Sequence, residues 1–164
     1  MPTNPPLNVL RIHRTESMLT LIGVPDVPGS GAEIFRALAT RSIPITGIVQ
    51  NAPDAGSASI TFTVPKTHLA EALEETRNMV EKLGAIGVMN DEYIARFSVL
   101  GEEVLENTVG LAGEFFSVLA EERINILAIN STADALSCII EDANLDRASK
   151  LLCDRFGLSV EKIG

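Results

Sequence analysis

The chain has 164 residues, of which 46% are hydrophobic and 21% are charged, and 13 lysine and arginine residues against 22 aspartate and glutamate residues give a formal net charge of −9. A chain of this length can bury roughly 70% of its unfolded surface, which is enough for one ordinary domain or two small ones without disulfides. The acidic balance and an aromatic content of 4% argue against nucleic acid as a partner, because phosphates require clustered basic side chains and bases stack on rings.

The first half of the chain is predicted to form a strand, a helix, two strands and a second helix. Ile34, Phe35 and Leu38 recur at helical spacing. Residues 57–64 alternate apolar and polar side chains, as a strand with one solvated face does. In chain order these elements cover residues 18–24, 32–41, 43–50, 57–64 and 67–83.

The second half repeats the first. With a shift of 81 residues Gly29 falls on Gly110 and Phe35 on Phe116. The shift later drops to 76, and the lost residues fall in the turn-forming segment 51–57, where a change in length is tolerated. We therefore predict an α+β fold in which a ferredoxin-like βαββαβ unit is used twice, each antiparallel sheet carrying its helices on one face. The second set of elements covers residues 93–100, 111–122, 124–129, 135–141 and 144–156.

No ordinary catalytic, metal-binding or membrane motif accompanies this pattern. Cys138 and Cys153 lack CxxC spacing and are predicted to be buried structural thiols, and His13 and His68 stand alone, so we expect no metal, no cofactor and no catalytic residue. The apolar runs are far shorter than the about 20 residues of a membrane helix, and residues 1–8 lack the features of a signal peptide, which predicts a soluble, cytoplasmic protein. An acidic cluster is interpreted as solvated surface rather than a cation or acid–base site; it consists of Glu102, Glu103 and Glu106.

Three motifs of the first unit resemble the first ACT domain of aspartate kinases: Gly-Val-Pro-Asp-Val-Pro-Gly at 23–29, Ile-Val-Gln-Asn at 48–51 and Ile-Thr-Phe-Thr-Val-Pro-Lys at 60–66. The second unit is similar to the second ACT domain of that family through Ile-Asn-Ile at 124–126 and the strand at 136–140. The Lys-Phe-Gly-Gly signature of the family's kinase domain is missing. The resemblance therefore implies a non-catalytic regulatory subunit or an excised regulatory region.

The resemblance also implies how the two ACT domains are connected. In this family the first domain is inserted into the second, which gives a first domain of residues 15–92 and a second of residues 1–14 plus 93–164. Residues 7–14 are then the candidate for the edge strand that the second domain lacks. Family members form homodimers that pair the first ACT domain of one chain with the second of its partner and bind threonine or lysine between them.

The loop around Asp26 has the chemistry that a free amino acid requires. Pro28 and Gly29 precede a predicted helix, whose first N–H groups lack partners within the helix and attract a carboxylate. Gly29 and Gly31 permit close approach of a ligand, and Asp26 can accept the ammonium group. On composition alone, an aspartate before Pro-Gly is equally an ordinary turn or cap residue.

Three further residues match the family's effector site. Gln50 reaches the ligand from the adjacent strand, and Asn125 with Ile126 closes the pocket from the partner chain. Each has a plainer interpretation, since Gln50 is also the start of a turn and Asn125 the outward residue of an alternating strand. The expected effector-binding set is Asp26, Gly29, Gly31, Gln50, Asn125 and Ile126.

The second unit departs from the family in its own loop. It carries Val109-Gly110 in place of Pro-Gly, and residues 130–135 read Asn-Ser-Thr-Ala-Asp-Ala where the family tends to have Ser-Thr-Ser-Glu-Ile-Lys. We therefore expect the half-site on this loop to be altered or silent.

The resemblance predicts a regulatory subunit that binds threonine, alone or with lysine, for feedback inhibition of an associated aspartate kinase catalytic subunit in aspartate-family amino-acid biosynthesis. The alternative is an orphan tandem-ACT protein that binds another ligand or serves as a scaffold for a different enzyme.

Overall fold

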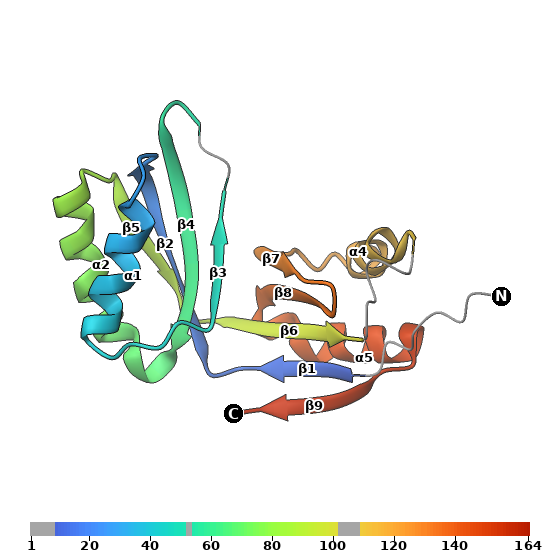
Figure 1. Ribbon diagram of the computed structural model, residues 1–164. Coiled ribbons are helices and arrows are strands. Elements are labelled where there is room, and N and C mark those ends of the chain that lie inside the picture. Colours follow the sequence, from blue (N-terminus) through green and yellow to red (C-terminus); the bar gives the residue numbers. More distant parts are fainter. Residues whose placement is uncertain (1–8, 52–53, 102–108) are drawn as a thin grey trace. The chain divides into compact units, whose positions relative to one another are not determined.

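The computed structural model describes residues 9–51, 54–101 and 109–164, and the chain divides into two compact units (Figure 1). One unit, Thr15–Glu92, is continuous in sequence, and we call it the inserted unit. The other combines Met1–Arg14 with Tyr93–Gly164, and we call it the outer unit. Each unit has its own sheet and its own hydrophobic core.

The inserted unit contains a four-stranded sheet in the order β3-β4-β2-β5, in which all neighbouring strands are antiparallel. Its two helices lie on one face of this sheet (Figure 1), as the alternating strand pattern predicts. The elements are β2 (Glu16–Pro25), α1 (Ser30–Thr40), β3 (Gly47–Gln50), β4 (Ser57–Pro65), the short 3-10 helix η1 (Lys66–His68), α2 (Leu69–Leu83) and β5 (Gly87–Asp91).

The core of the inserted unit is built by the two periodicities seen in the sequence. On β4 every second side chain faces the helices, so that Ile60, Phe62 and Val64 are buried. Ile34 and Leu38 lie one turn apart on α1 and are fully buried against them. Removing an apolar side chain of this size from water contributes about 1.5–3 kcal/mol, which explains why both patterns reach the core.

The outer unit contains a five-stranded sheet in the order β7-β8-β6-β1-β9. Strand β1 pairs antiparallel with β6 and parallel with β9, and the other pairs are antiparallel. The elements are β1 (Val9–His13), β6 (Ile94–Leu100), α4 (Leu111–Glu121), β7 (Ala128–Ser131), β8 (Ala135–Glu141), the 3-10 helix η2 (Asp142–Asn144), α5 (Leu145–Phe156) and β9 (Ser159–Ile163).

Phe115 lies at the centre of the outer unit's core. Its ring centroid is 5.8 Å from that of Phe97, 5.9 Å from that of Phe116 and 6.1 Å from that of Phe156. Cys138 is fully buried in the same cluster, and burial raises the pKa of its thiol to about 12. A thiol that stays protonated is a poor nucleophile, which agrees with its interpretation as a structural residue.

Two predicted strands begin later than the sequence suggests. Residues 43–46 and 124–127 connect a helix to its strand, and the strands β3 and β7 start only at Gly47 and Ala128. The reason is that Ile43 and Ile124 are committed to the preceding helices: their N–H groups donate to the carbonyl oxygens of residues 38 and 119, at 3.1 and 3.0 Å. Both isoleucines are buried as parts of the connection. Their apolar character predicted strand residues, but neither one pairs with a neighbouring strand.

No helix in the described part of the chain is long and apolar enough to cross a membrane.

Candidate functional site

The loop between β2 and α1 is held in one shape by its own hydrogen bonds. The Asp26 N–H donates to the carbonyl oxygen of Gly56 at 2.9 Å, which ties the loop to the turn between β3 and β4. The Val27 N–H donates to the carbonyl oxygen of Pro25 at 2.9 Å. The hydroxyl of Ser30 donates to the same oxygen, also at 2.9 Å, so the first residue of α1 closes the loop.

The loop ends at the positive end of α1. Gly29 is the N-cap residue, with a φ of 100° that favours glycine. The Ser30 N–H donates to the Val27 carbonyl at 3.3 Å, and the Glu33 N–H donates to the Gly29 carbonyl at 2.9 Å. The N–H groups of residues 31 and 32 lie between the N–H groups of Ser30 and Glu33, in the first turn of α1, where the helix dipole favours an anion.

The surface of this loop is open. Asp26 and Gly29 are exposed, and Val27 is 59% exposed, an unusual value for an apolar side chain in a well-bonded loop. A Cβ atom added to Gly29 or to Gly31 would meet nothing within 4 Å. A small ligand can therefore reach both the backbone N–H groups and the carboxylate of Asp26.

Gln50 is the last residue of β3, at the end of the sheet where β2 also ends. Strands β2 and β3 both run antiparallel to β4, so both end where β4 begins, beside the Asp26 loop. Gln50 pairs with Ile60, a residue of the core, which places both side chains on the helix-bearing face. Because β3 is the edge strand (Figure 1), Gln50 is exposed there, as is Ile48, two residues earlier on the same face.

The remaining two predicted residues belong to the outer unit. Asn125 is exposed and Ile126 is half-buried against the core of that unit, both in the connection between α4 and β7. Asn125 is not a strand residue, so the plainer interpretation of it as part of an alternating strand is wrong. The structure thus places Asp26, Gly29 and Gly31 in and beside one loop of the inserted unit and Gln50 at the end of an edge strand of the same unit, and holds Asn125 and Ile126 on the other unit of the same chain.

Two residues that the sequence did not single out hold the loop from outside it. Ser30 fixes the loop to the carbonyl of Pro25, and Gly56 accepts the hydrogen bond from Asp26. Serine near a helix start is a recognised sequence signal, but at Ser30 the hydroxyl points back to the strand instead of capping the helix. The role of Gly56 depends on pairing between distant strands, which no local pattern reveals.

The corresponding loop of the outer unit is different. Strand β6 ends at Leu100 and α4 begins at Leu111, whereas only residues 26–29 separate β2 from α1. Gly110 is the N-cap of α4, and Val109 beside it is fully exposed. The acidic cluster Glu102, Glu103 and Glu106 lies outside the described residues.

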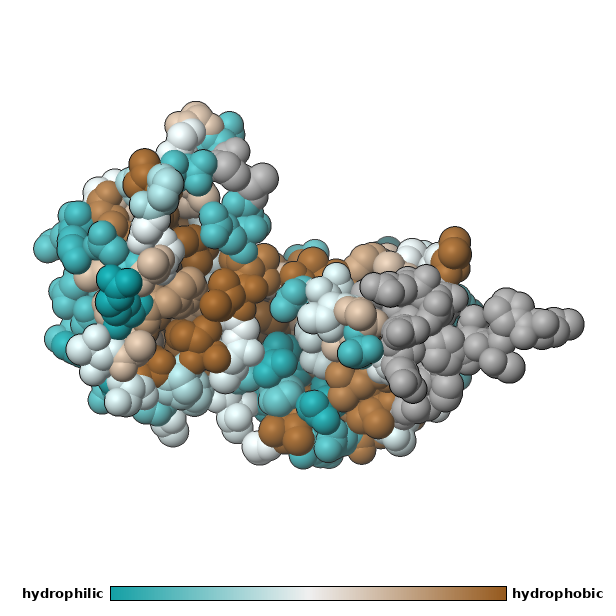
Figure 2. All heavy atoms as spheres, viewed as in Figure 1, coloured by the Kyte–Doolittle hydropathy of each residue, from teal (hydrophilic) through white to brown (hydrophobic). Residues whose placement is uncertain are grey.

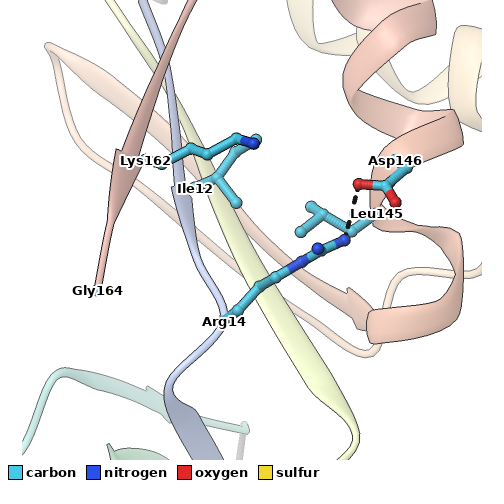
Figure 3. A pocket seen from close by; sticks show the side chains of 6 residues that line it. All are labelled: Ile12, Arg14, Leu145, Asp146, Lys162 and Gly164. Atoms are coloured by element: carbon cyan, nitrogen blue, oxygen red, sulfur yellow. Dashed lines mark hydrogen bonds and ion pairs between the residues drawn. The ribbon is translucent and has the colours of Figure 1, made fainter.

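A small hollow of about 60 Å³ lies elsewhere, on the outer unit (Figure 3). Arg14 points across it to Asp146, with 2.8 Å between the ion-paired atoms, and also pairs with Asp142 at 3.3 Å. Its guanidinium is thus already neutralised by two carboxylates. None of the predicted site residues lines this hollow, whose lining consists of Ile12, Arg14, Leu145, Asp146, Lys162 and Gly164.

Most of the molecular face in Figure 2 is hydrophilic or mixed, with apolar residues gathered in separate patches. Among residues 9–51, 54–101 and 109–164, no three histidine, cysteine, aspartate or glutamate side chains form a group that could hold a metal ion. The chemistry that the described part offers is therefore polar recognition at a loop and a helix start.

Comparison with known proteins assigns the chain to a family. A family model for the ACT domain matches residues 97–156. An aspartokinase from Mycolicibacterium smegmatis is 33% identical over 147 residues, which cover 88% of this chain but only 35% of that relative.

Solved structures extend the similarity to both units. The regulatory subunit of aspartate kinase from Thermus thermophilus, in a ligand-free form, superimposes with a TM-score of 0.82 and 28% identity, over 90% of this chain and 96% of that one. A chain from a structure of aspartokinase alpha and beta subunits gives a TM-score of 0.84 and 28% identity, over 93% and 99%. Residues 97–156 therefore match the ACT domain family, and the chain is similar, over nearly all of its length, to the regulatory part of aspartate kinases.

Proposed function

We propose that this chain senses a free amino acid, threonine or lysine, and thereby regulates an aspartate kinase. The observation that carries the proposal is the exposed carboxylate of Asp26 beside the uncovered start of α1. A free amino acid carries one negative and one positive group a few bonds apart. The loop presents a carboxylate and a helix N-terminus, which are complementary in charge to these two groups.

The ligand's two charged groups have distinct partners in this proposal. Its carboxylate accepts hydrogen bonds from the N–H groups at the first turn of α1, where the dipole adds attraction. Its ammonium donates to the Asp26 carboxylate, which forms a charge-assisted hydrogen bond. The amide of Gln50, the last residue of β3, is proposed to form a hydrogen bond with the ligand's side chain.

Two unpaired sheet edges support a homodimer that completes this site. Strands β3 and β7 each pair with a single neighbour and occupy an edge of their sheets. They carry Ile48 and Ile129 at equivalent positions of the repeat, 47% and 39% exposed. An exposed strand edge with an apolar side chain is a template for pairing with another chain. Pairing of β3 with the partner's β7 would bring the partner's Asn125 and the partner's Ile126 toward the Asp26 loop.

Regulation follows if the amino acid binds one arrangement of the paired units more tightly than another. A ligand with equal affinity for both arrangements shifts nothing. A site shared by two chains meets this requirement, because its geometry depends on how the chains are paired. The catalytic subunit of an aspartate kinase is the proposed recipient of the change, consistent with the alpha and beta subunits named for a structurally similar protein.

Thermal unfolding with added amino acids tests ligand binding. A ligand that binds only the native state adds about 2.7 kcal/mol at 100 times its Kd, which raises the Tm of a chain this size by roughly 5–10 °C. We expect such a rise with threonine or lysine. Threoninol and N-acetylthreonine, which lack the carboxylate and the ammonium respectively, are the controls and should give almost no shift. If no aspartate-family amino acid raises the Tm, the chain is better explained as an orphan tandem-ACT scaffold.

A further inference from the structure

The strand that leads into the Asp26 loop is irregular. On β2 the register with β4 runs from Leu21 opposite Ile60 to Val24 opposite Ala58. Three steps on one strand thus match two on the other, which is the signature of a β-bulge with one extra residue. Gly23 lies in the bulge with a φ of 67°, in the left-handed region that favours glycine.

The equivalent strand of the outer unit has no such bulge among its described residues. Strand β6 occupies the equivalent place in the outer unit, as the inner strand that leads to the first helix of its repeat. Its register with β8 is unbroken from Ile94 opposite Glu141 to Leu100 opposite Ala135. Within the described residues, the β6–β8 ladder therefore contains no bulge, whereas the ladder that leads into the Asp26 loop does.

The side chain of Ile86 covers the bulge. A Cβ atom on Gly23 would lie 2.5 Å from Cγ1 of Ile86, closer than real Cβ contacts allow. The N–H of Ile86 donates to the carbonyl oxygen of Ile22 at 2.8 Å, so the backbone that enters β5 is fixed against the bulge. Ile86 is nevertheless 79% exposed, which means that its position is not explained by burial in the core.

A bulge bends its strand and increases the local twist, and in this way it re-aims the residues that follow. After the bulge, Pro25 pairs with Ser57 and the Asp26 N–H reaches the carbonyl oxygen of Gly56. The first contact joins the end of β2 to the start of β4, and the second joins the Asp26 loop to the turn before β4. They lie within three residues of Gly23, so their geometry depends directly on it.

We propose that Gly23 is a positioning residue for the effector site: its bulge, closed by Ile86, aims the Asp26 loop at the ligand. The ligand in this inference is the one in the proposed function, whereas the geometry of the bulge does not depend on that function. A side chain at position 23 must displace Ile86 and also strain the left-handed backbone. The loop would then lose the hydrogen bond from Asp26 to Gly56.

The test compares Gly23→Ala with Gly84→Ala. Gly84 is a matched control because it lies in the same unit with a φ of 71°, while a Cβ there would meet nothing within 4 Å. Both variants should lower the Tm, since alanine is strained at either position. Only Gly23→Ala should raise the dissociation constant for threonine or lysine, by about tenfold or more, and only it should speed amide hydrogen exchange at Asp26.

Equal effects of the two variants on affinity and on exchange at Asp26 would overturn the positioning role. If the wild-type protein binds neither amino acid, the proposed function fails, and the exchange rate at Asp26 alone then decides the role of Gly23. Should Gly23→Ala not fold, Gly23→Asn replaces it, because asparagine tolerates the left-handed region while its Cβ atom still meets the side chain of Ile86. Full retention of Asp26 protection in Gly23→Asn would likewise show that the loop is held by Asp26's own contacts and not by the bulge.

Discussion

Replacing Asp26 with asparagine is expected to raise the dissociation constant for threonine or lysine by about 10- to 100-fold. A hydrogen bond to a charged group contributes about 1.5–3 kcal/mol, and a difference of 1.4 kcal/mol is a factor of ten in affinity. The asparagine side chain keeps the size of aspartate but not its charge. The backbone N–H that donates to Gly56 is retained, so the loop itself should persist. Isothermal titration calorimetry measures the change directly.

Asp54→Asn is the matched control for that variant. Asp54 is exposed on the turn between β3 and β4, in the same unit, and its backbone pairs with Ser57. The substitution removes the same charge without touching the proposed ammonium contact. It should therefore change the dissociation constant by no more than about twofold at physiological ionic strength, since salt weakens the interactions of exposed charges that make no direct contact. An Asp26→Asn affinity equal to that of the control would show that Asp26 does not bind the ligand.

Replacing Phe115 with alanine is expected to destabilise the outer unit by about 3–5 kcal/mol, the usual cost of truncating a buried phenylalanine. The ring is 1% exposed and is packed against three other phenylalanine rings. Its removal leaves a cavity between β6 and the two helices that the surrounding side chains cannot fill without repacking. Urea denaturation, followed by circular dichroism, gives the free energy of unfolding.

Phe116→Ala provides the control within the same helix. Phe116 is the next residue on α4 but is only half-buried, so the same truncation should cost clearly less. Hydrogen exchange can assign the loss to a unit, because the inserted unit has a separate core. Equal destabilisation by the two substitutions would mean that the ring cluster around Phe115 is not the centre of the outer core.

The fold could be predicted largely because its signals are local and occur twice. Alternation on Ile60, Phe62 and Val64 and helical spacing on Ile34 and Leu38 each point to one face, and the structure buries those faces. The repeat then transfers the prediction from one half to the other. Strands β5 and β9 were not located by pattern. Their side chains are largely exposed or half-buried, so no strong apolar alternation marks them.

The candidate site could be predicted only in part, for a physical reason. The residues in the motif at 23–29 are contiguous, and the structure places them at the end of β2 and in the loop that leads to the start of α1. The hydrogen bond from Asp26 to Gly56 and the closure of Ile86 over Gly23 join segments that are far apart in sequence. Such contacts depend on strand register, and a one-residue bulge in β2 decides that register without leaving a periodic signal.

Aspartate kinase activity shows whether this chain regulates the enzyme. The measurement is the rate of aspartate phosphorylation by the complete enzyme that contains this chain, against rising threonine and lysine. We predict that one of these amino acids inhibits the wild-type enzyme and that about 10-fold or more of it is needed with Asp26→Asn, matching the loss of binding affinity. Kinase activity that stays constant at every concentration of both amino acids, in an enzyme whose purified regulatory chain binds one of them, would contradict regulation through this site.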